Sequence, residues 1–285
     1  MSMIDLILPA GCAVGFVLLE RLVALKRGQK VLRSGWLTDV LHIFVGGAVI
    51  RLGMIAIAVM LSLIAAPLVP GPVADAVRAQ PVWAQYLAVL ITAELGIYWT
   101  HRMAHAVPVL WRFHAVHHSS RELDWMSSHR EHPVEQLMFS GVALAPAIVF
   151  GIEPLPLLIY GVTYHVHALL LHANVRLDFG PLAQVIGSPR FHHWHHADQR
   201  EAYDMNFAAQ LSILDRIFGT FRLPQTGHPE RYGVSDPVPE GFVGQLGYPI
   251  GSPFSQRVDE GSHAIRGGVA AKRTDEGFRP QRDAP

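Results

Sequence analysis

Residues 43–69 read IFVGGAVIRLGMIAIAVMLSLIAAPLV, and only one charged residue, Arg51, interrupts this apolar stretch. A helix of about 20 predominantly apolar residues is long enough to cross the hydrocarbon core of a bilayer. Residues 6–25 and residues 82–99 form two further runs of this length, which together contain few charged residues. Because three separate runs meet the length criterion, we expect helices that cross a membrane rather than buried helices of a soluble α-domain.

The composition of the 285-residue chain excludes several classes of protein. Half of the residues are apolar and 16% are charged, which is far from the composition of a disordered chain. Lys plus Arg and Asp plus Glu both number 23, so the chain lacks the basic excess of a dedicated nucleic-acid binder. We therefore expect no nucleic-acid partner. A single cysteine, Cys12, excludes a disulfide framework and a cysteine-rich zinc module.

The basic residues near the N-terminus predict an orientation in the membrane. The first apolar run follows Met-Ser-Met-Ile-Asp, which lacks the basic segment of a cleaved signal peptide, so we expect this run to be a retained helix. Lys26, Arg27, Lys30 and Arg33 come next, and short loops rich in such residues lie in the cytoplasm. Residues 67–81 then form a loop on the opposite side of the membrane.

Two shorter apolar runs, residues 137–152 and 155–171, are separated by Glu153-Pro154. We expect them to form a helical hairpin that enters the membrane and returns. The helix of residues 82–99 ends just before His101, and the hairpin ends at His172. This topology therefore brings every histidine cluster to the cytoplasmic face.

Histidine is concentrated in one part of the chain, since 14 of the 17 histidines lie between His101 and His196. Residues 101–105 have the spacing H-x3-H, while residues 114–118 and 192–196 each contain H-x2-H-H. On a helix, residues three and four apart lie on one face, so we expect each motif to direct two or three imidazoles to one point. Neutral imidazole is the commonest metal ligand in proteins and suits iron, zinc, copper and nickel. The clusters predict a metal site.

The number of clustered histidines predicts two metal ions, because eight motif histidines and His172 exceed what one tetrahedral or octahedral centre can hold. His42 is expected to pack in an apolar segment, and His228 and His263 to lie in a loop or tail. His129 is a weaker ligand candidate. The sequence lacks the motifs of several other sites. The absent motifs are H-E-x-x-H of zinc peptidases, C-x-x-C-H of haem attachment, G-x-G-x-x-G of dinucleotide binding, G-x-x-x-x-G-K-[ST] of nucleoside triphosphate binding and G-x-S-x-G of the nucleophile elbow.

These motifs resemble those of the fatty acid hydroxylase/sterol desaturase superfamily of membrane di-iron enzymes, in its bacterial branch. The order H-x3-H, H-x2-H-H, H-x2-H-H between hydrophobic spans carries the resemblance over about residues 85–225. Further matching segments are WRFHAVHHSS at residues 111–120, HPVE at 132–135, HANV at 172–175, PRFHHWHH at 189–196, NF at 206–207 and LDRIFGT at 214–220.

The resemblance implies two iron ions and an O2-dependent oxidation of a lipid C–H bond, by hydroxylation, desaturation or ether cleavage through hydroxylation. It implies a separate reductase or small electron carrier, because the chain has no evident flavin or cytochrome-type domain. The residues that match the ligand pattern are His101, His105, His114, His117, His118, His172, His192, His195 and His196.

Other residues near the motifs are candidates for ligands or for groups that hydrogen-bond ligands. His132 and His193 belong to matching segments, and His193 faces about 100° away from its ligand-like neighbour on a helix. His167 and His172 are separated by four residues rather than three, which departs from the H-x3-H of some relatives and weakens His167 as a ligand. The carboxylates and the amide that could contact ligating imidazoles are those of Glu135, Asp198, Asp204 and Asn206.

We therefore expect an all-α integral membrane helical bundle with a histidine-rich metal site on its cytoplasmic face. The expected parts are transmembrane helices in residues 1–81, a fatty acid hydroxylase-like catalytic domain in 82–224, a loop-rich extension in 225–254 and a disordered tail in 255–285. Arginine greatly outnumbers lysine, which is typical of a GC-rich bacterial genome, so we expect a multi-pass protein of the bacterial inner membrane.

Two other functions stay open at this point. A membrane metallohydrolase would use zinc-bound water, and the Asp and Glu residues near the clusters are compatible with it. A membrane electron carrier would hold a haem between two histidines, which needs no sequence motif.

Overall fold

The computed structural model of the chain describes residues 3–224 and 227–251, with the backbone alone for residues 3–10. The α-helices are α1 (Met3–Leu22), α2 (Trp36–Leu41), α3 (Gly47–Ile64), α4 (Gly71–Arg78), α5 (Val82–Ala106), α6 (Pro108–His118), α7 (Pro133–Val149), α8 (Pro154–His172), α9 (Pro189–His195), α10 (Ile213–Phe218) and α11 (Phe242–Gly251). One π-helical turn, η1 (His42–Gly46), and four 3-10 turns complete them: η2 (Ala66–Leu68), η3 (Trp125–His129), η4 (Gly180–Gln184) and η5 (Arg200–Ala202). These residues contain no strand beyond two isolated bridges, so the predicted all-α fold is confirmed.

Three segments of the described chain are long and apolar enough to cross a membrane. They are Trp36–Leu68, which joins α2, η1, α3 and η2, together with Val82–Ala106 and Pro154–His172. None of the most apolar window of Trp36–Leu68 is buried inside the protein, as expected of a helix whose surroundings are lipid. The predicted runs of residues 43–69 and 82–99 lie almost entirely in these segments, so the predicted membrane bundle is confirmed, and α7 is a shorter apolar helix within it. The predicted run of residues 6–25 overlaps α1 and is not among the three segments.

Prolines set the ends of the predicted hairpin. Both α7 and α8 carry a proline in their first turn, where a missing N–H leaves no helical hydrogen bond unmade. Gly151 adopts a φ of 71° between the two helices, a conformation that suits glycine. The chain therefore reverses over residues 150–153, at the position predicted from Glu153-Pro154.

Small residues let the long helices approach closely. A Cβ added at Gly53 of α3 would come within 2.6 Å of the Leu137 side chain, and one at Gly96 would come within 3.2 Å of the backbone at Ala143. Such contacts are typical of helices packed in a membrane. Val89, Ala93 and Ile97 of α5 pack against Ala143 and Ala147 of α7 and Tyr160 of α8, so these three helices share one core.

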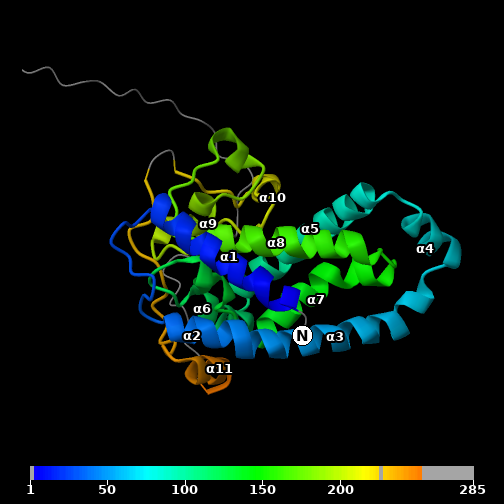
Figure 1. Cartoon of the computed structure of the whole chain (residues 1–285), viewed down its shortest axis with the longest axis horizontal. Coiled ribbons are helices and arrows are strands. Elements are labelled where there is room, and N and C mark those ends of the chain that lie inside the picture. Colours follow the sequence, from blue (N-terminus) through cyan, green and yellow to red (C-terminus); the bar gives the residue numbers. More distant parts are fainter. Residues whose placement is uncertain (1–2, 225–226, 252–285) are drawn as a thin grey trace, which may run out of the picture. The chain divides into compact units, whose positions relative to one another are not determined.

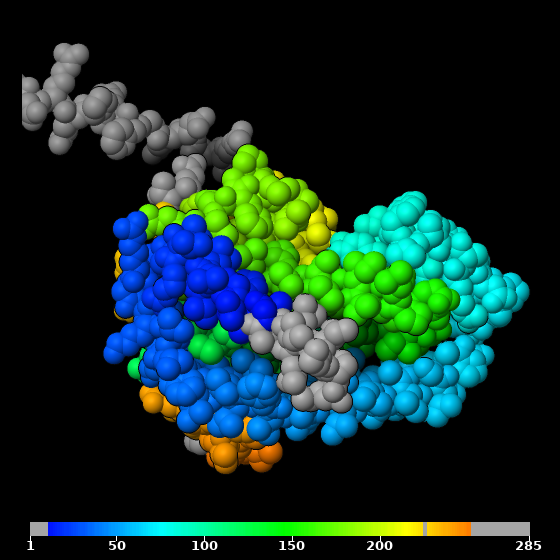
Figure 2. Space-filling view, viewed as in Figure 1, coloured from blue at the N-terminus to red at the C-terminus, as the bar shows by residue number. Residues whose placement is uncertain are grey.

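The bundle carries different chemistry at its two ends (Figure 1). The elements that bear the histidine motifs, α6, α9 and the end of α5, lie together with α2 and α11 at one end. The opposite end carries α4, which the space-filling view shows projecting beyond the neighbouring helices (Figure 2). Residues 67–81 were expected to be a loop, but Gly71–Arg78 form a helix. Pro72 in its first turn explains where this helix begins.

A buried network of ion pairs fixes the basic segment to the histidine end. Arg33 donates to Asp39 at 2.6 Å and to Asp124 at 2.8 Å, and Arg130 donates to the second oxygen of Asp39 at 2.6 Å. All four side chains are almost fully buried. Removing one member of such a network costs about 3–5 kcal/mol because it leaves an uncompensated buried charge. The segment that follows α1 is therefore held firmly against the loop before α7.

Backbone contacts near α1 reinforce this attachment. Leu25 N–H donates to the carbonyl of Asn174 at 3.1 Å, and Arg176 N–H donates to that of Val23 at 2.8 Å. The carboxylate of Glu20 accepts backbone N–H groups from Trp125 and Asn174. The predicted tail of residues 255–285 lies outside the described residues.

Candidate metal centre

Nine buried or half-buried histidines form two adjoining groups at one end of the bundle. The first group is His101, His105, His114, His118 and His195, and the second is His117, His172, His192 and His196. Within each group the candidate ligand nitrogens lie within 4.8 Å of one another. The two groups touch, since the rings of His118 and His196 are 4.4 Å apart between centroids. These nine are the residues that matched the ligand pattern in the sequence.

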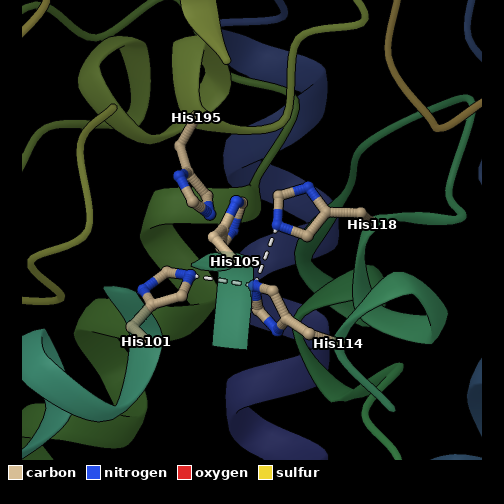
Figure 3. Close-up of side chains that lie close together, drawn as sticks. All are labelled: His101, His105, His114, His118 and His195. Carbon is tan, nitrogen blue, oxygen red and sulfur yellow. Dashed lines mark hydrogen bonds between the residues drawn. The ribbon is translucent and has the colours of Figure 1, made fainter. Parts of the chain in front are cut away.

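Four helices supply the histidines. In the first group, α5 contributes His101 and His105, α6 contributes His114 and His118, and α9 contributes His195 (Figure 3). Each pair on α5 and α6 is four residues apart, so both rings project from one face of their helix. Figure 3 shows the five rings converging from different elements on a common centre.

The two H-x2-H-H motifs do not each serve one point, as the spacing alone suggested. His117 on α6 belongs to the second group, although its neighbours His114 and His118 belong to the first. His195 on α9 belongs to the first group, although His192 and His196 belong to the second. Residues i and i+3 project about 60° apart on a helix, so two such side chains can belong to different groups when the groups adjoin. Both α6 and α9 therefore lie between the groups and contribute to each.

Backbone carbonyls fix the protonation of several rings. Nδ1–H of His101 donates to the carbonyl of Phe207 at 2.7 Å, that of His195 to Met205 at 2.8 Å, and that of His172 to Ala168 at 2.8 Å. A carbonyl oxygen can only accept, so Nδ1 carries the proton in each ring. Nε2 of the neutral ring is then left with a lone pair.

The Nε2 atoms approach one another too closely for such rings without a cation. Nε2 of His192, whose Nδ1 has no hydrogen-bond partner among the described residues, lies 3.0 Å from Nε2 of His172. Nε2 of His117, whose Nδ1–H donates to the backbone carbonyl of Arg130, lies 3.2 Å from Nε2 of His172. Two lone pairs at this separation repel. Two nitrogens each about 2.1 Å from one metal ion are about 3.0–3.4 Å apart at octahedral or tetrahedral angles. The second group therefore has the donors and the spacing of a metal site.

The first group fits a metal by the same criterion. Nε2 of His114 lies 3.0 Å from Nε2 of His101 and 3.0 Å from Nε2 of His118, the two approaches drawn as dashed lines in Figure 3. Nε2 of His195 is buried and has no hydrogen-bond partner among the described residues. A buried nitrogen of this kind is costly unless something binds it.

Burial also keeps these imidazoles neutral. Loss of solvent lowers the pKa of His195 to about 3, and it lowers the pKa values of His117, His118 and His192 well below the usual value. Neighbouring histidines lower these values further, because two positive rings repel. At neutral pH the rings therefore present lone pairs, the form that binds metals.

Carboxylates contact two histidines of the first group. Nδ1 of His114 hydrogen-bonds Glu135, whose side chain is buried on α7. Nδ1 of His105 lies 3.3 Å from the more exposed carboxylate of Asp204. Such partners orient a ligand ring and increase its basicity. Asp198, the third carboxylate expected near the site, instead accepts the hydroxyl of Tyr203.

The loop after α9 positions the carbonyls that bind His101 and His195. Asn206 adopts a φ of 61° and donates to the carbonyls of Phe191 and Arg222. Asp215 accepts the N–H groups of Phe207 and Ala208 at 2.7 and 2.8 Å. Asn206 thus braces this loop through hydrogen bonds to backbone groups rather than to an imidazole.

Glu94 and Asp215 have supporting roles that the sequence did not reveal. Glu94, buried on α5, accepts the N–H groups of Gln210 and Leu211, so it attaches the same loop to the membrane helix. Asp215 belongs to a segment that resembled the family, but spacing gave it no role. The one sequence signal that could have singled out Glu94 is its position as a lone carboxylate within an apolar run.

The other candidate histidines lie outside both groups. His132 caps α7, since its Nδ1 accepts Val134 N–H while its Nε2–H donates to Leu246. His167 Nε2 contacts the carbonyl of Gly187 at 2.8 Å. His193 Nε2–H donates to Ala173, next to His172, and its Nδ1 faces the Tyr232 hydroxyl at 3.3 Å. These contacts suit groups that brace the structure around the site.

His42 and His129 also make contacts of their own. Nε2 of His42 lies 2.8 Å from the amide oxygen of Gln245, and its ring meets Phe242 edge-on, so it packs as predicted. His129 lies 3.1 Å from the Ser128 hydroxyl and against the ring of His165.

A cavity of about 160 Å³ adjoins the histidine groups. Histidines of both groups line it, with Glu131 and Glu135 among its polar residues. Its apolar wall includes Ile97, Phe139 and Leu171. The ring of Phe139 lies 5.8 Å from that of His101, so an apolar ligand in this cavity would lie beside the imidazoles.

Comparison with known proteins matches this region to one family model, Fatty acid hydroxylase, over residues 86–220. These residues form a fatty acid hydroxylase domain. All nine histidines of the two groups lie within it. The superfamily that the sequence resembles is therefore confirmed.

Several curated relatives share this region. The chain is 34% identical over 171 residues to an ornithine lipid hydroxylase of Rhizobium tropici, which covers 60% of this chain and 51% of the relative. It is 33% identical over 159 residues to the alkylglycerol monooxygenase of Homo sapiens, covering 55% and 34%. A Delta(7)-sterol 5(6)-desaturase of Gibberella zeae is 24% identical over 147 residues, covering 52% and 40%.

The matches cover part of each relative: the aligned region spans about half of the ornithine lipid hydroxylase and about a third of the alkylglycerol monooxygenase. No solved structure gives a significant match to the chain.

We predict that the two histidine groups hold metal separately. Replacing His117 with Ala should remove the metal of the second group, and replacing His195 with Ala should remove that of the first, because each loses a ligand nitrogen. Metal analysis of the purified full-length variants, loaded anaerobically with Fe²⁺ and desalted, measures this. His228→Ala, outside both groups, is the control and should keep the wild-type content. Wild-type metal content in both cluster variants would contradict the assignment.

We also predict that Glu135 strengthens metal binding through His114. Glu135→Ala removes the acceptor at Nδ1 and should weaken metal affinity by about 10–100-fold. Glu135→Gln keeps an acceptor oxygen without the charge, so its loss should be smaller. Competition with a chelator measures the affinity, and Asp75→Ala on α4, at the other end of the bundle, is the matched control. Equal affinities of wild type and Glu135→Ala would refute this role.

Proposed function

We propose that this chain is an O2-dependent di-iron lipid oxygenase of a membrane, which hydroxylates or desaturates a C–H bond of a lipid. The observation that carries the proposal is the pair of adjoining histidine groups, nine imidazoles in all, within a fatty acid hydroxylase domain. The names of the relatives support the same chemistry, since they describe a lipid hydroxylase, a monooxygenase and a sterol desaturase.

Two iron ions are the cofactor that we propose. Nine imidazoles in groups of five and four would give each ion fewer than the six ligands of an octahedral site, which leaves positions for oxygen or substrate. When bound, iron would supply the oxidising power that removes hydrogen from an unactivated carbon in the presence of O2. The donor set alone would also accept zinc, so the choice of iron rests on the family.

The protein's own residues would orient the site and keep it dry. The carbonyls of Met205, Phe207 and Ala168 hold three rings in the tautomer with Nε2 free. Glu135 contacts Nδ1 of His114 and so orients this ring. The apolar side of the cavity, with Phe139 beside His101, would align a lipid chain and exclude water from the reacting carbon.

In this proposal the substrate is a lipid that reaches the site from the membrane in which the protein lies. The segments Trp36–Leu68, Val82–Ala106 and Pro154–His172 meet the requirements of membrane spans, and all three supply residues that line the cavity beside the histidines. A lipid could then enter from the bilayer without passing through water. Sterol, fatty acyl, ceramide-like and alkylglycerol lipids all fit this general layout.

We propose that the site faces the cytoplasm, in the inner membrane of a bacterium. The basic residues 26–33 support this side because they belong to the histidine end of the bundle, where Gln29 donates to the carbonyl of Leu123 at 2.8 Å. Positive loops lie in the cytoplasm. Electrons would reach the site there from a separate reductase or small electron carrier.

The two alternative functions are less well supported. A bis-histidine haem carrier would use two imidazoles and leave the remaining close Nε2 pairs unexplained. A zinc hydrolase fits the donor set, but the relatives bear the names of oxygenases and a desaturase.

Turnover under isotopically labelled O2 tests the proposed function. The purified iron-loaded chain, given an electron donor system and a total membrane lipid extract, should yield a lipid that gains one labelled oxygen atom or loses two hydrogens. Lipid mass spectrometry detects either change, and His117→Ala should abolish it. The same product under argon, or oxygen derived from labelled water instead of O2, would indicate a hydrolase and contradict the proposal.

A further inference from the structure

A second, larger cavity of about 580 Å³ lies among the membrane helices. Its walls come from α3, α5, α7 and α8, and most of the lining side chains are apolar. Ile55 on its α3 side is 54% exposed, and no part of the most apolar window of Trp36–Leu68 is buried. The cavity is therefore a groove open to the lipid phase beside α3, which we call the lipid groove.

The lipid groove connects to the cavity beside the histidines. Ile97, Phe139 and Tyr164 line both spaces, so they form the neck between them. They come from three different helices, α5, α7 and α8, which share the core of the bundle. A chain in the groove can therefore reach the histidines only past these three side chains.

One charged residue lines this apolar groove. Among the residues of the described chain that form its walls, Arg51 alone carries a charge. Arg51 is exposed and makes no hydrogen bond or ion pair with the described residues. An ionisable side chain in a membrane segment with no protein partner is expected to have a functional partner. Guanidinium groups bind carboxylate and phosphate oxyanions strongly because they donate two parallel hydrogen bonds.

The charge-free run that follows Arg51 points to a place for this residue near the lipid headgroups. The 18 residues from Leu52 to Val69 carry no charge, and at 1.5 Å per residue they span about 27 Å, close to the thickness of the hydrocarbon core. A hydrocarbon core that begins at Leu52 would place Arg51 at its boundary on the histidine side. Ile50, the neighbour of Arg51, lines the cavity beside the histidines, so the expected position of the headgroup adjoins this cavity along α3.

We propose that the lipid groove binds a lipid with an oxyanion in its headgroup, that Arg51 pairs with this oxyanion, and that carbons near the headgroup pass the neck of Ile97, Phe139 and Tyr164. The inference rests on the proposed function, since it names the class of lipid that the site takes. The fixed separation of Arg51 from the histidines would select carbons close to the headgroup rather than at the end of the chain.

A matched pair of photoreactive probes tests the proposal. Hexadecyl phosphate and hexadecanol, each with the same mid-chain diazirine, are added to the purified full-length protein, with its metal as isolated, in micelles of a non-ionic maltoside detergent. The measured quantities are the probe concentration for half-maximal labelling and the labelled peptides. The phosphate probe should bind about tenfold more tightly than the alcohol. It should label α3, α5, α7 or α8 at the groove.

Variants at Arg51 distinguish a specific ion pair between Arg51 and the phosphate probe from a general attraction of this probe to positive charge. Arg51→Gln should remove the preference for the phosphate probe while leaving the alcohol unchanged, and Arg51→Lys should retain part of it. Arg27→Gln, which removes an exposed charge from the basic segment, is the matched control and should behave as wild type. Equal binding of the two probes to wild type, an unchanged preference in Arg51→Gln, displacement by inorganic phosphate alone, or labelling confined to other helices would overturn the proposal.

The labelling requires no turnover, so the result is separable from the proposed function. Arg51-dependent labelling in a protein that fails to incorporate oxygen would leave the binding site and refute the oxygenase. Oxygen incorporation without any effect of Arg51→Gln on labelling would leave the oxygenase and refute the binding site.

Discussion

The hydrogen bonds between histidine Nδ1–H groups and backbone carbonyls are the interaction on which the site depends. They place the proton on the outer nitrogen of His101, His172 and His195, so that the inner nitrogen keeps its lone pair. Burial lowers the pKa of His195 and prevents protonation from relieving the crowding. The result is that the lone pairs of His172 and His117 face each other with their nitrogens 3.2 Å apart, an arrangement that a bound cation would stabilise.

Much of the remaining structure holds those carbonyls and helices in place. Asp215 and Asn206 shape the loop that offers the acceptors of His101 and His195, and Glu94 attaches this loop to α5. At the same end, Asp39 joins two buried arginines, and one of them, Arg130, supplies the carbonyl near His117. The membrane helices, the loops and the ion pairs together therefore hold the imidazoles in position.

The sequence predicted the membrane helices and the nine histidines that cluster, but not the division of these histidines into two groups. Long apolar runs and helical spacing depend on local order, so the membrane helices and the pairs His101/His105 and His114/His118 were foreseeable. The departure of His117 to the second group depends on how α6 and α9 pack, which spacing does not encode. The roles of Asp215 and Glu94 depend on contacts between distant segments, and α4 was missed because a short helix has too few residues for a clear periodic pattern.

The central claim is that two adjoining groups of histidines bind a pair of metal ions. X-ray absorption at the iron edge of the iron-loaded full-length protein, combined with a metal count per chain, tests it most directly. The account predicts two irons per chain, a first shell of nitrogen and oxygen with the outer-shell scattering of several imidazoles, and no sulfur ligand. A single iron per chain, or a spectrum without imidazole scattering, would contradict it.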